Sequence, residues 1–186
     1  MRIRSAYALL LCVTLVMLGC AKGDRGPTGP AGPPGDPGTA NVIYSDWFSP
    51  PTWNAVTQFG IAWRTFTMGA PSLTQDVVDH GVVLVYMRFG GYNPDVVQLP
   101  VVLPDVGLSF SFRARVDSVR AEYYSPSNPT VYPVVVPPSN LVRYVLIPGG
   151  VVDGAMVAEG GTREQAVAGL RSLPYDEARR RFGLPD

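Results

Sequence analysis

The sequence has few of the side chains on which most enzyme and metal sites depend. Its 186 residues include one histidine and two cysteines, only 16% are charged, and the net charge is zero. Such a chain lacks the long basic surface that nucleic-acid binding uses, so we expect no nucleic-acid partner. It also has no G-x-S-x-G, phosphate-binding loop, dinucleotide fingerprint, H-E-x-x-H or EF-hand motif. We therefore expect a protein that is not an enzyme and needs no cofactor or metal.

The single histidine, His80, lies in an Asp-His-Gly turn close to Asp76 and Asp79. A metal site or a catalytic triad would need further histidines, cysteines or a placed nucleophile, and the neighbouring sequence contains none. We interpret His80 as a turn residue. Asp76 and Asp79 are three residues apart and could share one face of a helical turn, so a glycosidase-type carboxylate pair remains a third-ranked hypothesis.

The N-terminus has an apolar run that is too short to cross a membrane. Arg2 and Arg4 precede an uncharged stretch from 6 to 18, which makes roughly 20 Å of helix against a hydrocarbon core of about 30 Å. A positive start followed by a short apolar run predicts a secretory signal peptide over 1–19. The stretch ends in Met-Leu-Gly-Cys at 17–20, which resembles the lipobox of bacterial lipoproteins.

This resemblance implies that Cys20 carries lipid and becomes the first mature residue, with 20–22 as the anchor site. Cys12 would be removed with the signal peptide, so the mature chain would have no free thiol or disulfide. Acyl chains on Cys20 make a membrane the first expected partner. Because Ala21 rather than aspartate follows the cysteine, the resemblance also implies export to the outer membrane.

A glycine ladder follows, with proline at many of the positions between the glycines. Only glycine fits the crowded axis of a collagen triple helix, so the segment 23–40 is similar to a bacterial collagen-like stalk of roughly 55 Å. Two interpretations stay open. The stalk and head form a homotrimer, or a proline-stiffened spacer carries one monomeric head. The repeat glycines are Gly23, Gly26, Gly29, Gly32, Gly35 and Gly38.

From residue 41 to about 150, segments rich in valine and aromatic residues alternate with proline, glycine and asparagine breaks. This pattern predicts a mainly β head, an antiparallel β-sandwich or jelly roll. The run 82–87 is nearly all apolar and predicts a central strand covered on both faces, whereas 108–116 alternates and is half-buried. Pro100 and Pro133 indicate edge strands or bulges. The expected strands are 42–48, 56–68, 82–89, 96–103, 108–116, 118–124, 131–136 and 141–147.

The C-terminal part predicts a mobile glycine-rich connector over 151–161, then short helices over 162–186. Thr162 and Gln165 have capping-box spacing. A second helix has Pro174 in its first turn and ends near Phe182, before Gly183. One face of that helix should dock on the head or on a neighbouring chain, and it consists of Tyr175, Ala178 and Phe182.

Three tryptophans, Trp47, Trp53 and Trp63, are the candidate ligand-stacking residues, since indoles can stack on sugars; the alternative is that they belong to the core.

The lipobox, the glycine ladder and the stretches NVIYSDWF and RYVLIPGG together resemble a group of collagen-like bacterial lipoproteins. That family implies lipid attachment and no catalytic residues. The leading hypothesis is a non-enzymatic, lipid-anchored envelope protein that presents its head for structural or adhesive contact with a surface partner. The alternative is a carbohydrate- or small-ligand-binding module.

Lipid attachment can be tested directly. We expect cells that express the chain to incorporate a fatty-acid analogue into it, and the Cys20→Ala variant to lose that label because the acyl acceptor is gone. The Cys12→Ala variant is the matched control and should label normally. Equal labelling of the Cys20→Ala variant and the unaltered chain would contradict the predicted anchor.

Overall fold

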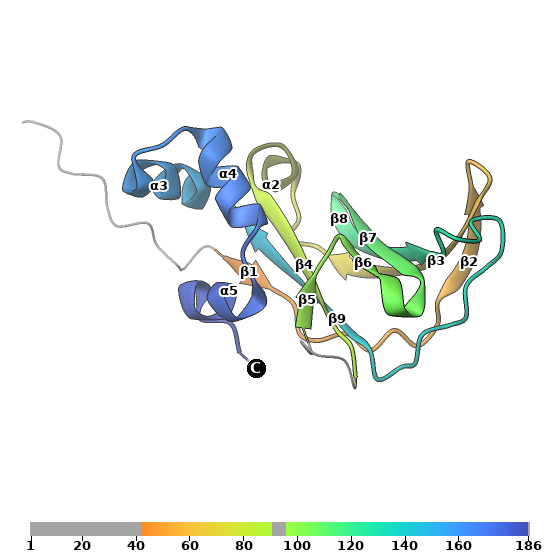
Figure 1. Cartoon of the computed structure of the whole chain (residues 1–186). Helices are drawn as coiled ribbons and strands as arrows, with labels where there is room; N and C mark the ends of the chain where they lie inside the picture. The colour runs from red at the N-terminus through yellow and green to blue at the C-terminus, as the bar shows by residue number, and fades with distance from the viewer. Residues whose placement is uncertain (1–41, 91–95, 186) are drawn as a thin grey trace, which may run out of the picture. The chain divides into compact units, whose positions relative to one another are not determined.

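A computed structural model describes residues 42–90 and 96–185 (Figure 1). The predicted signal peptide, Cys20 and the stalk glycines lie outside the described residues. As predicted, the described part is mainly β and contains two antiparallel sheets. Short helices complete it, three of them following the last strand.

Sheet 1 has four strands in the order β1 (Ile43–Tyr44), β9 (Leu141–Ile147), β4 (Val82–Arg88) and β5 (Val96–Gln98). Sheet 2 has five strands in the order β2 (Asn54–Gln58), β3 (Ile61–Ala70), β8 (Asp117–Tyr124), β7 (Leu108–Arg115) and β6 (Val101–Leu103). The helices are α2 (Gln75–His80), α3 (Gly149–Glu159), α4 (Arg163–Arg171) and α5 (Tyr175–Phe182), with a 3₁₀ turn at Pro104–Val106.

The main core lies between the two sheets. Sheet 1 contributes Val85, Met87 and Val142, and sheet 2 contributes Phe110 and Tyr123, all buried in one apolar cluster. The predicted alternation along β7 is confirmed, since its apolar positions pack on this cluster. On the opposite face of the same strand, Arg113 Nε donates to Glu122 Oε1 over 2.8 Å.

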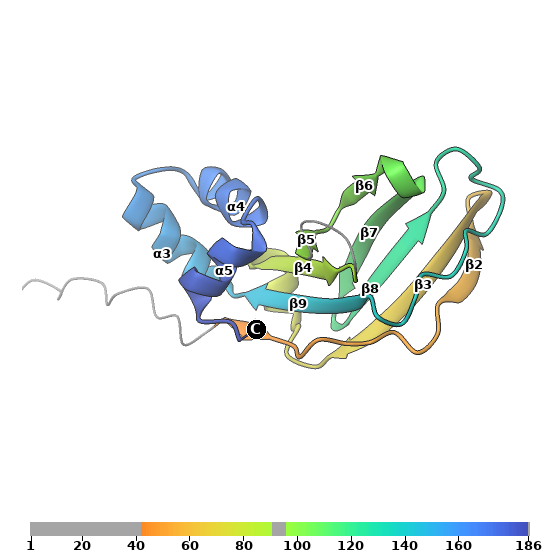
Figure 2. The same ribbon diagram turned by 60° about the horizontal axis from the view of Figure 1, so that its bottom comes forward.

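A second core lies on the other face of sheet 1, where α3, α4 and α5 cover the sheet (Figure 2). β4 contributes Leu84 and Tyr86 to this cluster, and α4 and α5 contribute Leu170 and Phe182. The predictions that β4 is buried on both faces and that the last helix docks on the head are therefore confirmed.

The segment predicted as one strand over 56–68 is a hairpin, which corrects the sequence interpretation. The chain turns at Phe59 and Gly60, whose φ angles are +53° and +77°. Two successive positive φ values are typical of the two-residue turns that suit the twist of paired strands. Asparagine-glycine is the usual sequence signal for such a turn, and phenylalanine in the first position hides it.

Three other expected strands also differ. The segment 42–48 contains only the two-residue β1 and an isolated bridge from Phe48 to Val142. The segment 96–103 divides at Leu99–Pro100 into β5 and β6, which are edge strands of different sheets, so Pro100 does mark an edge. The segment 131–136 forms no strand. Pro133 within it and Pro137 and Pro138 directly after it lack the N–H that a strand ladder needs.

The expected connector at 151–161 is wrong, because the chain forms α3 there. Pro148 precedes the helix and Gly160, with φ of +66°, ends it. The glycines weaken the intrinsic helix propensity, but Val151, Val152 and Ala155 are buried against sheet 1. Tertiary packing therefore stabilises a helix that local propensity does not predict.

The next two helices follow the sequence prediction. Thr162 Oγ1 accepts from Gln165 N–H over 3.3 Å, and Gln165 Oε1 accepts from Thr162 N–H over 2.8 Å. This reciprocal pair is the predicted capping box at the start of α4. Pro174 precedes α5, and Gly183 ends it with φ of +64°.

The docking of α5 gives a stability prediction. We expect Phe182→Ala to lower the free energy of unfolding by about 3 kcal/mol, because a buried aromatic ring is removed and leaves a cavity. Urea unfolding followed by circular dichroism measures the change. Arg180→Ala on the exposed face of α5 is the control and should change stability by less than about 0.5 kcal/mol. Equal effects of the two substitutions would contradict the docked arrangement.

Candidate functional site

The three candidate stacking tryptophans lie in three different layers. Trp53 is buried between the sheets, 3% exposed, with its ring 4.9 Å from that of Tyr123. Trp63 lies on sheet 2 and contacts Tyr124, with ring centroids 4.6 Å apart. Trp47 packs in the cluster beneath the helices. The structure does not bring the three indoles together around one concave surface.

Trp47 is partly buried, and two arginines lie over its ring. The guanidinium carbons of Arg88 and Arg143 lie 4.5 and 4.7 Å from its ring centroid. Tyr175 of α5 meets the same indole edge to face at 5.4 Å. Cation–π contacts of this kind stabilise a desolvated arginine, so Trp47 helps to bury Arg143.

Arg143 fastens the C-terminal segment to sheet 1. The residue is 2% exposed, and its Nη1 donates to Tyr175 Oη over 2.8 Å and to the Pro185 carbonyl over 2.7 Å. Nearby, Tyr86 Oη donates to the Leu173 carbonyl over 2.9 Å. Burial, with a smaller contribution from the charge of Tyr175, raises the pKa of Tyr86. These buried polar groups hold α5 in place.

The residues considered for catalysis form an exposed helical turn. His80 Nδ1 lies 2.9 Å from Asp76 Oδ1, and Asp79 Oδ1 accepts from Gln75 Nε2 over 2.8 Å. Both members of the His80–Asp76 pair are more than half exposed. Within residues 42–90 and 96–185, no group of three or more His, Cys, Asp or Glu side chains could hold a metal ion. This turn shows no enclosed site for a substrate.

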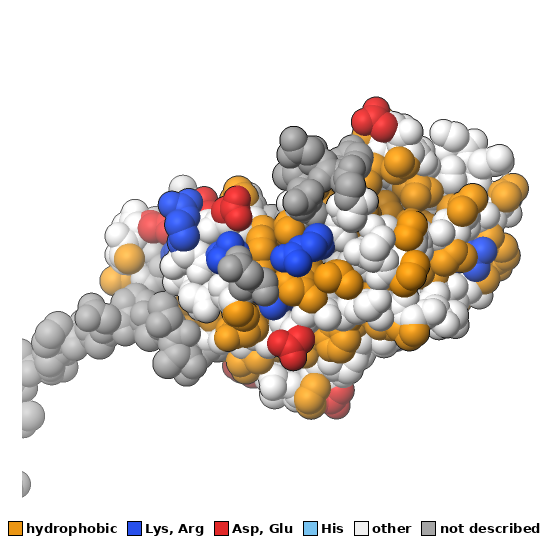
Figure 3. Space-filling view, turned by 90° about the horizontal axis from the view of Figure 1, so that it is seen from below, with side chains coloured by type: hydrophobic (Ala, Val, Ile, Leu, Met, Phe, Trp, Pro, Cys, Tyr) orange, Lys and Arg blue, Asp and Glu red, His pale blue; other side chains and the backbone are white. Residues whose placement is uncertain are grey.

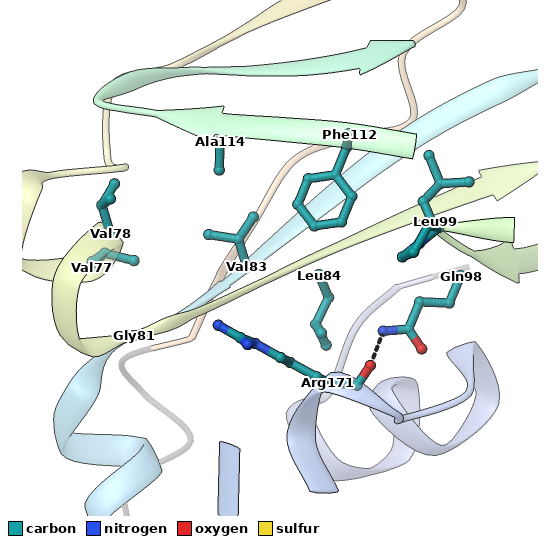
Figure 4. Close-up of a pocket in the computed structure, with 11 residues that line it drawn as sticks. Val77, Val78, Gly81, Val83, Leu84, Gln98, Leu99, Phe112, Ala114 and Arg171 are labelled. Atoms are coloured by element: carbon teal, nitrogen blue, oxygen red, sulfur yellow. Dashed lines mark hydrogen bonds between the residues drawn. The ribbon is translucent and has the colours of Figure 1, made fainter. Parts of the chain in front are cut away.

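An apolar pocket opens between α2, β4 and β7, where the two sheets separate (Figure 4). Its volume is about 280 Å³, close to the lower end of the range for small-molecule sites. The lining contains one charged side chain, Arg171, and one amide, Gln98, and otherwise only apolar residues. The full lining is Val77, Val78, Gly81, Val83, Leu84, Gln98, Leu99, Pro100, Phe112, Ala114 and Arg171.

A second feature, the apolar tip, lies where the β2–β3 hairpin and the loop 125–140 run side by side (Figures 1 and 2). Three hydrogen bonds join them, from Ala62 N–H to the Pro129 carbonyl, from Arg64 Nε to the Pro133 carbonyl, and between the Thr57 and Tyr132 hydroxyls. Its exposed apolar side chains are Phe59 (98%), Val131 (54%), Tyr132 (41%), Val134 (88%) and Val135 (48%).

The chain around the apolar tip carries no charge over two long segments. Residues 47–63 and 123–142 contain no Asp, Glu, Lys, Arg or His, although the remaining chain has both signs interspersed. Figure 3 shows hydrophobic side chains gathered over this end of the head, with few charged ones among them. An exposed apolar surface of this kind marks an interaction site more often than an ordinary surface does.

Sequence reasoning missed both features, although signals for them exist. The uncharged segments can be read directly from the sequence, and together with the turn at Phe59–Gly60 they would have indicated an exposed apolar end. The pocket has no such signal. It brings together Val78, Gln98, Ala114 and Arg171 from four elements far apart in the sequence.

Comparison with known proteins adds no functional assignment: no family model, curated protein or solved structure matches the chain. In the described part of the chain, no helix is long and apolar enough to cross a membrane. The apolar tip and the pocket are therefore the features of the molecule that bear on its function.

Proposed function

We propose that the chain is a non-enzymatic, lipid-anchored envelope protein of the collagen-like lipoprotein type. In this proposal Cys20 holds the chain in one membrane, and the apolar tip makes adhesive contact with a second lipid surface. The observation that carries the proposal is the combination of nearly full exposure and no charge at Phe59 and Val134. β1, which follows the first described residue, lies toward the opposite end of the head from this tip (Figures 1 and 2).

The composition of the apolar tip suits a lipid surface. Residues 47–63 and 123–142 contain no charged group that would have to be dehydrated in hydrocarbon, and charges are the most costly groups to bury there. Arg64, which follows the first segment, donates to the Pro133 carbonyl and lies over the Tyr132 ring. Tyr132 has an apolar ring and a hydroxyl bonded to Thr57, an arrangement typical of tyrosine at a membrane interface. The prolines of the loop reduce the number of backbone N–H groups that would lose water.

The expected strength of this contact is modest. Burying a phenylalanine or valine side chain in an apolar phase is worth about 1.5–3 kcal/mol, so Phe59 and Val134 together supply roughly 3–6 kcal/mol. A contact of this size resembles a single myristoyl chain, which binds reversibly. Many anchored copies on one surface would act together, because tethering raises the effective concentration of each contact.

The stalk leaves two assemblies open, and both would present the tip. A homotrimer through the stalk and head would carry three tips, whereas a spacer would carry one. Sedimentation of residues 21–186 at micromolar concentration distinguishes them by mass. The carbohydrate alternative has less support, because Trp53 is buried and Trp47 already contacts two arginines and Tyr175.

Vesicle docking tests the proposal. Vesicles that carry the lipidated chain should capture a second population of vesicles made of phosphatidylethanolamine and phosphatidylglycerol. Fluorescence energy transfer between labels in the two populations measures this capture. Phe59→Asn should weaken docking about tenfold or more, the loss expected for one buried ring. Asparagine-glycine is a favoured hairpin turn, so this variant should keep the fold.

Val157→Asn is the matched control, because Val157 is 67% exposed but lies on α3. It should dock like the unaltered chain. Docking should also persist at high salt, since the exposed side chains that make the contact, Phe59 and Val134, are uncharged. The proposal fails if the unaltered chain does not dock vesicles, or if the Phe59→Asn variant docks as well as the control.

A further inference from the structure

The pocket between the sheets exists because the chain leaves sheet 1 early. β5 pairs with β4 only from Tyr86 to Arg88. One further bond joins Leu99 N–H to the Val85 carbonyl over 2.8 Å, and Pro100 then leads into β6 of the other sheet. Among residues 42–90 and 96–185, the part of β4 before Val85 therefore has no strand partner on this side.

This free edge places backbone polar groups in the pocket. Along a strand, the N–H and C=O of every second residue point to the same side. Because the Val85 carbonyl points toward β5, the N–H and C=O of Val83 point the same way, and β5 has no residue opposite them. Val83 also lines the pocket, so a backbone donor and acceptor are present in an otherwise apolar wall.

The remaining walls are apolar and come from both layers of the head. Val77 and Val78 belong to α2, and Phe112 and Ala114 point inward from β7 (Figure 4). The lining has no carboxylate, imidazole, thiol or hydroxyl side chain. The pocket thus has no residue suited to acid–base or nucleophilic chemistry, and its design is that of a binding site.

Arg171 supplies the single charge. It is the last residue of α4, and its side chain extends past Leu84 toward Gly81 across the entrance of the pocket (Figure 4). Gln98 Nε2 donates to the Arg171 carbonyl over 2.6 Å and ties β5 to the helix. Among the described residues, the Arg171 guanidinium has no hydrogen-bond or ion-pair partner, and no acidic side chain lines the pocket.

We propose that this pocket binds a small carboxylate with one saturated hydrocarbon chain of about eight carbons. The carboxylate would pair with the Arg171 guanidinium, which offers two parallel N–H donors, and the chain would lie between Val77, Phe112 and Ala114. With roughly 30 Å³ for each water-sized group, the 280 Å³ pocket holds about nine such groups. A phospholipid with two long acyl chains is too large, so this site differs in ligand and location from the apolar tip.

Octanoate is the probe, and the full chain is the protein. Carbon-13 NMR of carboxyl-labelled octanoate at pH 7.5, with calorimetry in parallel, should show saturable binding of one octanoate per chain. Arg171→Gln should weaken binding about tenfold or more, because it removes the charge and keeps the length of the side chain. Arg115→Gln, at an exposed arginine on β7, is the control and should bind normally. The alcohol 1-octanol should bind equally to the unaltered chain and the Arg171→Gln variant.

A second pair of variants tests the location. Ala114→Leu fills the pocket from β7, and Val78→Phe fills its entrance from the exposed side of α2, so one of them remains informative if the other does not fold. Thermal melting checks folding, and the folded variant should no longer bind octanoate. The inference is overturned if the unaltered chain shows no saturable binding, if Arg171→Gln binds octanoate as tightly as the control, or if a folded, filled variant still binds it. Each of these results is independent of vesicle docking.

Discussion

The head depends on the burial of both faces of the β4–β9 strand pair. Side chains of β4 alternate between the core shared with sheet 2 and the core shared with the helices. Loss of either covering layer would expose a row of valine, leucine and tyrosine side chains, so the sheets and helices stabilise one another. The hydrogen bonds of Arg143 strengthen this arrangement, since they connect β9 to Tyr175 of the last helix and to the Pro185 carbonyl.

The residues with strong local signals were predictable. The continuous apolar run of β4, the alternation in β7 and the capping box at Thr162 each depend on neighbours within a few residues. The predictions failed where tertiary packing overrides local preference. The glycine-rich α3 is helical because one side is buried on sheet 1, and the valines of 134–136 form no strand because prolines surround them.

The candidate site shows the same division. The tryptophans could be identified by residue type, but only the fold shows that Trp53 belongs to the core and that Trp47 contacts two arginines. The pocket depends on β5 leaving sheet 1 before it has paired with the first residues of β4, and neither composition nor residue spacing in the sequence indicates this. By contrast, the uncharged segments on either side of the apolar tip are visible in the sequence, and only their exposure requires the fold.

The proline-rich loop beside the hairpin has a consequence for what happens when two copies of the protein meet. Three successive valines, 134–136, have the composition of an aggregation-prone strand, and two of them are exposed. Pro133 precedes them and Pro137 and Pro138 follow, and residues without an N–H cannot extend a ladder to another chain. Copies of the protein can therefore meet through this apolar loop without joining edge to edge into fibres.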